Sequence, residues 1–341
     1  AAAGRGARRA PAGPGLASGL SGGHSFIGEI ALRALICGSM AYDTIMVFQD
    51  RFKNHILPDQ VHILNVSFLV PQMRREFGGC AGNIAYNLKL LGGDPLPMAT
   101  VGEDFGPYFE WLDKHGIDRR HVTPVPGSYT GQAFITTDLD DNQITAFHPG
   151  AMNESHRNSL ADVPAPDIGI VAPDGRDGML LHAREFAEAG VPFIFDPGQG
   201  LPLFDKADLL GFIDQATWIT VNDYEIELLQ TRTELSAGDI AKRVEALIVT
   251  RGGKGSSIYA GGHRIDIPAV TPAAVNDPTG CGDAYRAGLL YGLLHKLDWP
   301  TTGRIASLMG AIKIEHHGTQ NHHFTREAFE QRYVAQFGQG F

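Results

Sequence analysis

The second half of the chain alternates short apolar runs with segments in which apolar residues recur at helical spacing. The apolar runs are rich in β-branched and aromatic residues and predict buried strands at 168–172, 192–196, 218–221 and 246–250. The segments between them predict helices at 176–189, at about 205–214 and through Leu229. Such strands, alternating with helices, are typical of a mostly parallel sheet covered on both faces. The pattern therefore predicts an α/β protein with three layers, α/β/α.

Further strands are predicted in the first half of the chain. Two short buried strands are expected at 34–39 and 99–102, the second followed by a helix to about His115. Other runs predict accessory strands at 44–48, 61–68, 131–137 and 143–147. The last two are joined across Asp140–Asn142, whose side chains suit a turn. We expect these strands to form a small lid sheet, drawn from about 43–75 and 129–148.

Two predicted helices begin next to glycines. Gly78 and Gly79 precede a helix with apolar residues at 84, 88 and 91, which Gly92–Gly93 ends. Glycine at such a position lets a polar ligand approach the backbone closely. Asn83, in the first turn, either caps this helix or hydrogen-bonds ligand hydroxyls, because its carboxamide can both donate and accept.

The second such helix begins near Gly282 or Asp283, after the stretch Asn276–Asp283 (NDPTGCGD), and its apolar residues continue to Leu297. A Gly-x-Gly turn at a helix start leaves backbone N–H groups without partners, and the helix dipole adds positive potential. The turn therefore predicts an anion hole suited to a phosphate. Asp283, at its edge, is a candidate general base for an attacking hydroxyl; an ordinary Asp-capped helix is the alternative.

Polar residues also follow the predicted strands directly. The carboxyl ends of parallel strands meet at one edge of a sheet, where α/β proteins bind ligands. Asp43, alone among β-branched residues, either faces a ligand there or caps a turn. The other residues at such ends are Asp196, Asn222, Glu225, Thr250 and Gly252.

Composition narrows the class of protein. The 341 residues, 43% of them hydrophobic, suffice for one large α/β domain, with or without a small appendage. A net charge of −10 argues against a nucleic-acid partner, and no apolar run reaches the roughly 20 residues that span a membrane. The three cysteines, Cys37, Cys80 and Cys281, have neither zinc spacing nor a disulfide framework. They indicate a reducing cytoplasm.

Residues 1–33 differ from the rest. They are rich in Ala, Gly, Pro and Ser, and prolines and glycines interrupt the apolar region that a signal peptide needs. Their arginines and their single acidic residue, Glu29, also resemble a transit peptide. We interpret this segment as a disordered leader that comes from a tag or from upstream translated sequence, in agreement with the missing initiator Met. The folded domain is then expected over 34–335, with a tail at 336–341.

Four motifs together resemble those of the ribokinase-like (PfkB) carbohydrate kinases. Asp277–Tyr285 is similar to their C-terminal D-T-x-G-A-G-D signature, and Gly78–Gly79 with Asn83 and Gly92–Gly93 to their N-terminal signature. Asn222-x-x-Glu225 is similar to their N-x-x-E motif, and Thr250-x-Gly252-x-x-Gly255 to their nucleotide loop. The motifs occur in the family's order and span about 34–335. Within the family, 147–152 and 315–322 resemble bacterial adenosine kinases and related nucleoside kinases.

Three departures from the family pattern stand out. Cys281 replaces the commoner alanine, which keeps the hole small but adds an oxidisable thiol, and Pro278 replaces a common threonine. The segment 196–200 lacks the Asn and Arg that many sugar kinases carry there. This last departure favours a nucleoside over ribose or fructose as the acceptor.

The resemblance implies ATP-dependent phosphorylation of the 5′-hydroxyl of a nucleoside, adenosine first, by direct in-line transfer. Asp283 would be the base, and the N–H groups of Gly280, Cys281 and Gly282 would stabilise the transferred phosphoryl group. Mg²⁺ would bridge the ATP phosphates, held through water near Asn222 and Glu225. The ATP site would be lined by Thr250, Gly252 and Gly255.

The resemblance also assigns the acceptor site. Asp43, Gly78, Gly79 and Asn83 would contact the ribose. From the predicted lid strands themselves, Phe134 and Phe147 are candidates to face a ring-shaped ligand, and packing in the core is the favoured alternative for each. Asp277 and Thr279, with carbonyls from 313–318, correspond to the family's monovalent-cation site and suggest K⁺.

Several alternatives remain open from the sequence. One is a sugar or sugar-phosphate kinase of the same family, and another is a non-catalytic nucleoside-binding regulator. Arg286 is expected to form a salt bridge rather than touch the phosphoryl group. The histidines at 316, 317, 322 and 323 lack carboxylate partners, so surface or nucleotide-edge roles are favoured over a metal site. The protein is either a monomer or a homodimer, because the lid sheet can be a free flap or an interface.

Overall fold

A sheet of nine strands forms the centre of the structure, which is a computed structural model that describes residues 32–56, 66–140 and 142–341. The described residues belong to one compact unit, Ala31–Phe341. Across the sheet the strands are β13 (His263–Ile267), β12 (Ser256–Ala260), β11 (Ala246–Thr250), β10 (Trp218–Asn222), β9 (Phe193–Phe195), β8 (Ile168–Val171), β1 (Arg33–Cys37), β4 (Asp94–Val101) and β5 (Val122–Pro124). From β11 to β5 they run parallel, and the hairpin β12–β13 joins them antiparallel. The mostly parallel sheet predicted from the sequence is confirmed.

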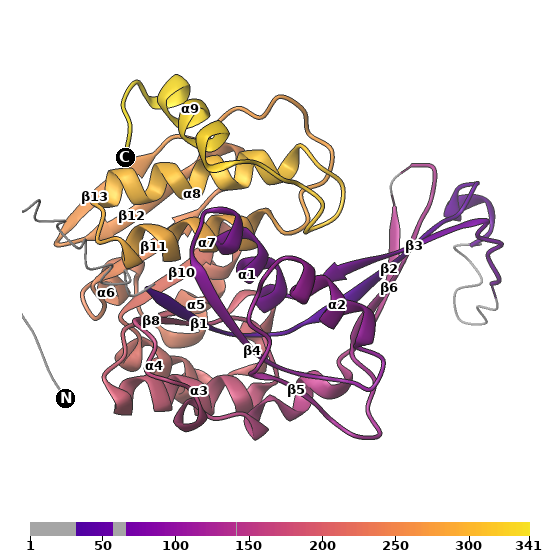
Figure 1. Cartoon of the computed structure of the whole chain (residues 1–341), viewed down its shortest axis with the longest axis horizontal. Helices are drawn as coiled ribbons and strands as arrows, with labels where there is room; N and C mark the ends of the chain where they lie inside the picture. The colour runs from indigo at the N-terminus through magenta and orange to yellow at the C-terminus, as the bar shows by residue number, and fades with distance from the viewer. Residues whose placement is uncertain (1–31, 57–65, 141) are drawn as a thin grey trace, which may run out of the picture. The chain divides into compact units, whose positions relative to one another are not determined.

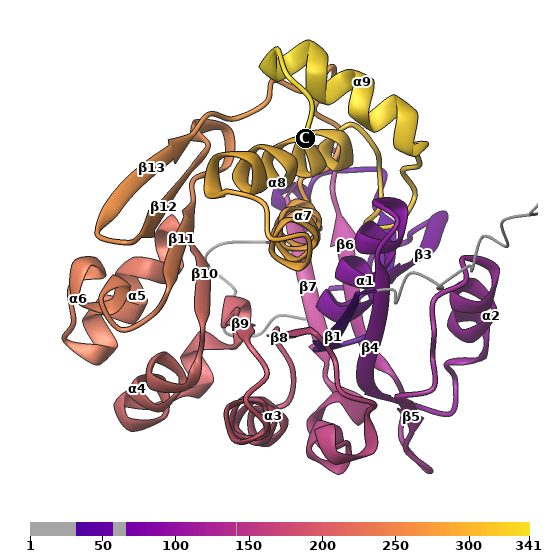
Figure 2. The ribbon, with the colours of Figure 1, turned by 60° about the vertical axis from the view of Figure 1, so that its left-hand side comes forward.

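Two hydrophobic cores lie on opposite faces of this sheet, because successive side chains of a strand point to opposite sides. In β1, Ala34 and Ile36 belong to one core, and Leu35 and Cys37 belong to the other. The helices on the first face are α1 (Cys80–Leu90), α2 (Gly106–Lys114), α7 (Cys281–Leu294), α8 (Trp299–Ile314) and α9 (Arg326–Phe337). The helices on the second face are α3 (Arg176–Ala189), α4 (Lys206–Gln215), α5 (Asp223–Thr233) and α6 (Ala237–Ala241). Figure 2 shows the two layers of helices with the sheet between them.

A second sheet of four strands forms the lid, in the order β3 (Gln72–Gly78), β2 (Ala41–Val47), β6 (Gly131–Thr137) and β7 (Gln143–His148). Figure 1 shows β2, β3 and β6 side by side, away from the layers of the main sheet. Paired residues of neighbouring strands lie on the same face of a sheet, so the register assigns every lid side chain to a face. Glu76, Asp43, Ala133 and Phe147 share one face.

Most predicted elements are confirmed, and α3 has the predicted bounds of 176–189. The strand predicted at 61–68 is wrong in its described part: residues 66–68 are irregular, and the lid strand is β3. Residues 61–65 lie outside the described residues. The aromatic ring of Phe68 packs against Phe48 and Phe52 instead of in a strand. The sequence of β3, QMRREFG, is largely exposed, so its charged residues gave no apolar pattern to detect.

The carboxyl end of the chain also differs from expectation. Helix α9 continues through Phe337, past the expected boundary at 335. The ring of Phe341 lies 4.6 Å from that of Tyr333, so the last residue packs on the core. No helix in the described part of the chain is both long and apolar enough to cross a membrane.

Candidate active site

The parallel strands bring their polar carboxyl-terminal residues to one edge of the main sheet, as predicted. Asn222 is the last residue of β10 and pairs in register with Thr250, the last residue of β11. Asp196 directly follows β9, and Glu225 lies in the first turn of α5. The sheet therefore places the predicted nucleotide-binding residues on neighbouring strands.

The N-terminus of α7 carries the candidate anion hole. Gly280 precedes the helix with a φ of 78°, a left-handed conformation that favours glycine. Within the described residues, the backbone N–H groups of Gly280, Gly282 and Asp283 have no hydrogen-bond acceptor. The N–H of Cys281, by contrast, donates to the carbonyl of Pro278 at 3.2 Å. The free N–H donors therefore differ from the predicted set of Gly280, Cys281 and Gly282. The N–H of Asp283 is free in addition to those of the two glycines, and the N–H of Cys281 is not free.

The chain's own packing explains the small residues of this turn. A Cβ on Gly282 would lie 2.7 Å from Arg286 Nη1, and a Cβ on Gly280 would lie 3.1 Å from Thr319 Cγ2. The thiol of Cys281 is partly buried, and burial raises its pKa to about 11. It is therefore a neutral thiol at physiological pH, with a low thiolate fraction for oxidation.

Asp283 is held by a chain of hydrogen bonds that reaches α2 and the 315–322 loop. Its Oδ2 accepts from Asn83 Nδ2 at 2.8 Å, and Asn83 Oδ1 accepts from Gln320 Nε2 at 3.0 Å. Gln320 Nε2 also donates to the Tyr108 hydroxyl at 2.6 Å, and Gln320 Oε1 accepts from Trp111 Nε1 at 2.8 Å. Burial raises the pKa of Asp283 to about 6, against the opposing effects of the Asn83 hydrogen bond and the Arg286 charge. The carboxylate is thus ionised at neutral pH and more basic than an exposed aspartate.

Arg286 lies one turn after Asp283 and forms a buried ion pair with Asp196. Its Nε and Nη2 donate to the two carboxylate oxygens of Asp196, both at 2.8 Å. The two side chains are 8% and 2% exposed. The salt bridge expected for Arg286 is confirmed, and its charge also acts on Asp283 and Glu225. The pair therefore joins the first turns of α7, which carry the anion hole, to the end of β9.

Asp43 lies on the lid face that carries Glu76. Among the described residues, no donor hydrogen-bonds its carboxylate, so both oxygens are available to a ligand. Burial raises the pKa of Asp43 to about 6, with smaller effects of Asp277 and Glu76. Both Asp43 and Asp283 act electrostatically on the buried hydroxyl of Tyr108.

The protein itself leaves no free space for a side chain at Gly78 or Gly79. A Cβ on Gly79, whose φ is 85°, would lie 2.6 Å from the Ser39 carbonyl oxygen and from Met40 Cα. A Cβ on Gly78 would lie 2.7 Å from Asp43 Oδ2. Close approach of the backbone at 39–41 therefore accounts for Gly79, whereas Gly78 leaves space for the carboxylate of Asp43.

The two candidate ring-binding residues lie on opposite faces of the lid. Phe147 pairs with Ala133, which pairs with Asp43, whereas Phe134 pairs with Thr44 and Ala146. Both rings are exposed, Phe147 by 54% and Phe134 by 41%. The expectation that both face one ligand is therefore wrong, because residues one register position apart point to opposite sides. Phe147 is the aromatic ring on the Asp43 face.

Asn222 and Glu225 form a capping box at the start of α5. Asn222 Oδ1 accepts from the Glu225 N–H at 2.8 Å, and the Glu225 carboxylate accepts from the N–H and Nδ2 of Asn222 at 2.8 and 2.9 Å. Burial raises the pKa of Glu225. Each oxygen retains a lone pair, so the pair can still accept a hydrogen bond from a metal's water ligand. No group of three or more His, Cys, Asp or Glu side chains with metal-binding geometry, at 316–323 or elsewhere, occurs in the described ranges.

The loop after β11 also reaches this edge. Thr250 Oγ1 donates to the Val221 carbonyl at 3.4 Å. Gly252 begins the 3₁₀ helix Gly252–Lys254 with a φ of 51°, and a Cβ there would meet no atom within 4 Å. A Cβ on Gly255 would overlap the Ile267 carbonyl oxygen. Gly252 thus faces open space, and Gly255 is required by the neighbouring strand.

The segment with Asp277 and Thr279 packs against the end of α8. The Asp277 carboxylate accepts from the Thr279 N–H and the Gly318 N–H, each at 2.9 Å. Lys313 Nζ donates to the Asp277 carbonyl at 2.7 Å and to the His316 carbonyl at 3.2 Å. The region in which the sequence suggests K⁺ therefore contains a side-chain ammonium.

Sequence reasoning missed Tyr108, Gln320 and Lys313. Gln320 lies in a stretch noted only for its resemblance, and Tyr108 lies on a helix with no motif. The one available signal for Lys313 is its charge within the apolar run of α8, because a lysine buried in a core needs specific acceptors.

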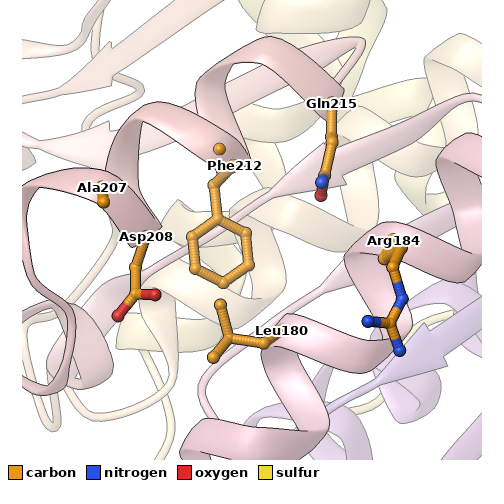
Figure 3. Close-up of a pocket in the computed structure, with 7 residues that line it drawn as sticks. Leu180, Arg184, Ala207, Asp208, Phe212 and Gln215 are labelled. Carbon is orange, nitrogen blue, oxygen red and sulfur yellow. The ribbon is translucent and has the colours of Figure 1, made fainter.

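A separate hollow on the surface lies between α3 and α4. Figure 3 shows Leu180 and Phe212 between the Asp208 carboxylate and the Arg184 guanidinium. None of the residues that line it belongs to the predicted site. The hollow is therefore distinct from the candidate active site.

Comparison with known proteins assigns the family. The family model for pfkB carbohydrate kinases matches residues 39–325. A nucleoside kinase of Methanocaldococcus jannaschii is 33% identical over 258 residues, which are 75% of this chain and 85% of that protein. A Burkholderia thailandensis nucleoside kinase, solved with inosine, is 55% identical with a TM-score of 0.82 over 90% of this chain and 99% of the other. The same kinase was also solved with ADP and inosine; that structure is 57% identical, with a TM-score of 0.80 over 90% and 97% of the two chains.

The fold and these relatives define a phosphotransferase that acts on a hydroxyl group. The chain belongs to the pfkB family of carbohydrate kinases.

Proposed function

We propose that the protein transfers the γ-phosphoryl group of ATP to the 5′-hydroxyl of a nucleoside, with Asp283 as the general base. The observation that carries the proposal is the position of Asp283: its carboxylate, hydrogen-bonded by Asn83, lies beside free backbone N–H groups at the start of α7. The nucleoside oxygen attacks the γ-phosphorus while the bond to the ADP oxygen breaks, and the proton passes to Asp283. The free N–H groups stabilise charge on the transferred phosphoryl oxygens.

In this proposal the nucleoside binds against the lid. The two oxygens of Asp43 are free to accept hydrogen bonds from the vicinal hydroxyls of a ribose. Phe147 lies on the same face of the lid, where its aromatic ring would contact the nucleobase. Asn83 is hydrogen-bonded to Asp283 and Gln320, so it positions the general base Asp283 as well as contacting the ribose. Adenosine is the first candidate substrate, and inosine is the second because the Burkholderia kinase was solved with inosine.

In this proposal ATP binds at the carboxyl edge of β10 and β11. The position of Thr250, Gly252 and Gly255 at that edge supports this assignment. Mg²⁺ bound with ATP would be held through water near Asn222 and Glu225, and it would neutralise charge on the phosphates. The ADP complex of the Burkholderia kinase supports ATP as the co-substrate. A sugar kinase of the same family and a non-catalytic nucleoside-binding protein are the alternatives.

The test is a phosphorylation assay with ATP and Mg²⁺ on adenosine, inosine, guanosine, cytidine, ribose and fructose 6-phosphate. We expect nucleosides to be the preferred acceptors and Asp283→Asn to lower kcat by about 10²–10⁴-fold, because the base is lost. Asp43→Asn is the matched control, since it keeps the base and is expected to raise the KM of the nucleoside. A preference for free ribose would establish the sugar kinase, and binding without turnover would establish the regulator.

A further inference from the structure

A buried ammonium lies under the loop that ends in the anion hole. The side chain of Lys313, in the last turn of α8, is 0% exposed. Its Nζ donates to the carbonyl of Asp277 at 2.7 Å and to that of His316 at 3.2 Å. Its charge also acts on the carboxylates of Asp277 and Asp283. The position at the C-terminal end of a helix favours a cation further.

The oxygens of the neighbouring segments already accept hydrogen bonds within the protein. The Ile314 carbonyl accepts from the N–H groups of Asn276 and Asp277, at 2.9 and 3.2 Å. The Glu315 carbonyl accepts from Asn276 Nδ2 at 2.6 Å, and the His317 carbonyl accepts from Asn321 Nδ2 at 3.1 Å. Both oxygens of the Asp277 carboxylate accept backbone N–H groups. A monovalent cation needs several such oxygens at once, and one bound here would face the ammonium at close range. The residues present therefore do not fit K⁺.

We infer that Lys313 takes the place of a monovalent cation, that it positions the 277–283 loop for phosphoryl transfer, and that the protein needs no K⁺. The ammonium draws the Asp277 carbonyl and the His316 carbonyl toward one point, which joins the start of the loop to the turn after α8. The loop runs from there through Gly280, which contacts Thr319 of that same turn, to the free N–H groups. Lys313 is thus a positioning residue that touches neither substrate. The inference rests on the proposed function.

The first experiment uses the unaltered protein. Initial rates with ATP, Mg²⁺ and inosine or adenosine are measured in KCl, NaCl and choline chloride at equal ionic strength. We expect the rates to differ by less than about twofold, because the fixed charge is already present. The melting temperature should likewise differ by less than about 1 °C between KCl and choline chloride, since an ion that does not bind gives no stabilisation. A larger activation or a larger shift specific to K⁺ would overturn the inference.

The second experiment changes the charge. Lys313→Met keeps most of the side-chain volume, and we expect kcat to fall by about tenfold or more with KM values little changed, since the anion hole loses its support. Lys313→Ala leaves space for an ion, and we expect K⁺ or NH₄⁺ to restore part of kcat and to raise its melting temperature. A kcat for Lys313→Met near that of the unaltered protein, or no restoration of Lys313→Ala by either ion, contradicts the inference.

The matched control is Lys242→Met. Lys242 is exposed, and it pairs with Asp239 on the surface at 3.0 Å, so its loss should leave kcat and salt response unchanged. If neither Lys313 variant folds, the two measurements on the unaltered protein decide the question. If the unaltered protein phosphorylates no nucleoside, the proposed function fails, whereas the comparison of melting temperatures still tests the absence of K⁺ binding.

Discussion

The proposed base depends on partners that lie far from it in the sequence. Asp283 is bonded by Asn83, which is bonded by Gln320, and the two links join residues 200 and 237 positions apart. The network leaves the carboxylate ionised at neutral pH yet keeps its pKa raised by burial. Such a value suits general-base catalysis, because a more basic group accepts a proton more readily. The acceptor-site carboxylate of Asp43 has a similarly raised pKa.

The dependence of kcat/KM on pH tests both carboxyl groups. Burial raises the pKa values of Asp43 and Asp283 to about 6, so each is protonated as pH falls through that value, and activity should fall with it. We expect a plateau above about pH 7 and a steep acid limb that reports two ionisations. In the Asp43→Asn variant, kcat/KM should still decrease at acid pH, but the decrease should report a single ionisation, that of Asp283. An acid limb that disappears in this variant would assign the ionisation to Asp43 alone and contradict Asp283 as the base.

Among the secondary-structure elements, the lid strands and α7 hold the residues of the proposed acceptor site and the proposed base. Helix α7 presents its N-terminus to the site and is fixed at its start by the Arg286–Asp196 pair. The lid presents one face to the site, and this face holds Asp43, Ala133 and Phe147. Contacts from the turn after α8 hold the lid in place, since Thr319 Oγ1 donates to the Phe77 carbonyl and Asn321 Nδ2 donates to Glu76. The turn after α8 thus contacts both the anion hole and the acceptor site.

The two lid phenylalanines provide a matched pair of substitutions. Phe147→Ala should raise the KM of the nucleoside by about tenfold, because an aromatic contact with a base contributes about 1–3 kcal/mol. Phe134→Ala removes a ring of similar exposure from the opposite face and should leave that KM unchanged. Steady-state kinetics with adenosine and with ATP as the varied substrate separate the two effects. A larger effect of Phe134→Ala than of Phe147→Ala would contradict the assignment of the faces.

At the scale of the whole molecule, the fold brings the proposed acceptor site and the proposed donor site together at the N-terminus of α7. The proposed acceptor site comes from β2, β3 and α1, and the proposed donor site comes from the carboxyl ends of β10 and β11. In the proposed function the N-terminus of α7 belongs to both. The two sites are built from different parts of the chain, so damage to one leaves the residues of the other in place. Their binding should therefore be separable even without turnover.

Thermal denaturation tests this separation. A ligand at about 100 times its Kd stabilises the native state by about 2.7 kcal/mol, which is several degrees in Tm for a protein of this size. Inosine and MgADP should each raise the Tm of the unaltered protein. Asp43→Asn should lose the shift with inosine and keep the shift with MgADP. Loss of both shifts, in a variant with an unchanged Tm of its own, would show that the two sites are not independent.

The sequence by itself determined the α/β alternation, the bounds of α3 and the residues at the strand ends, and it predicted the start of α7 to within one or two residues of Cys281. Those features follow from periodicity and from glycine and proline positions, which act over a few residues. The lid strand β3 was not predicted because most of its side chains are polar or charged and exposed. Its sequence therefore lacks the apolar pattern that identifies a buried strand.

Only the tertiary structure decided which side chains meet. The face of Phe147 and Phe134 depends on strand register, which a shift of one residue reverses. The partners of Asn83 and Lys313 lie on other elements, and Gln320 is 237 positions from Asn83. Contacts of this kind form because packing brings distant segments together, and local sequence patterns carry no record of them. The contact between the 277–283 loop and the ammonium of Lys313 could therefore be recognised only in the folded protein.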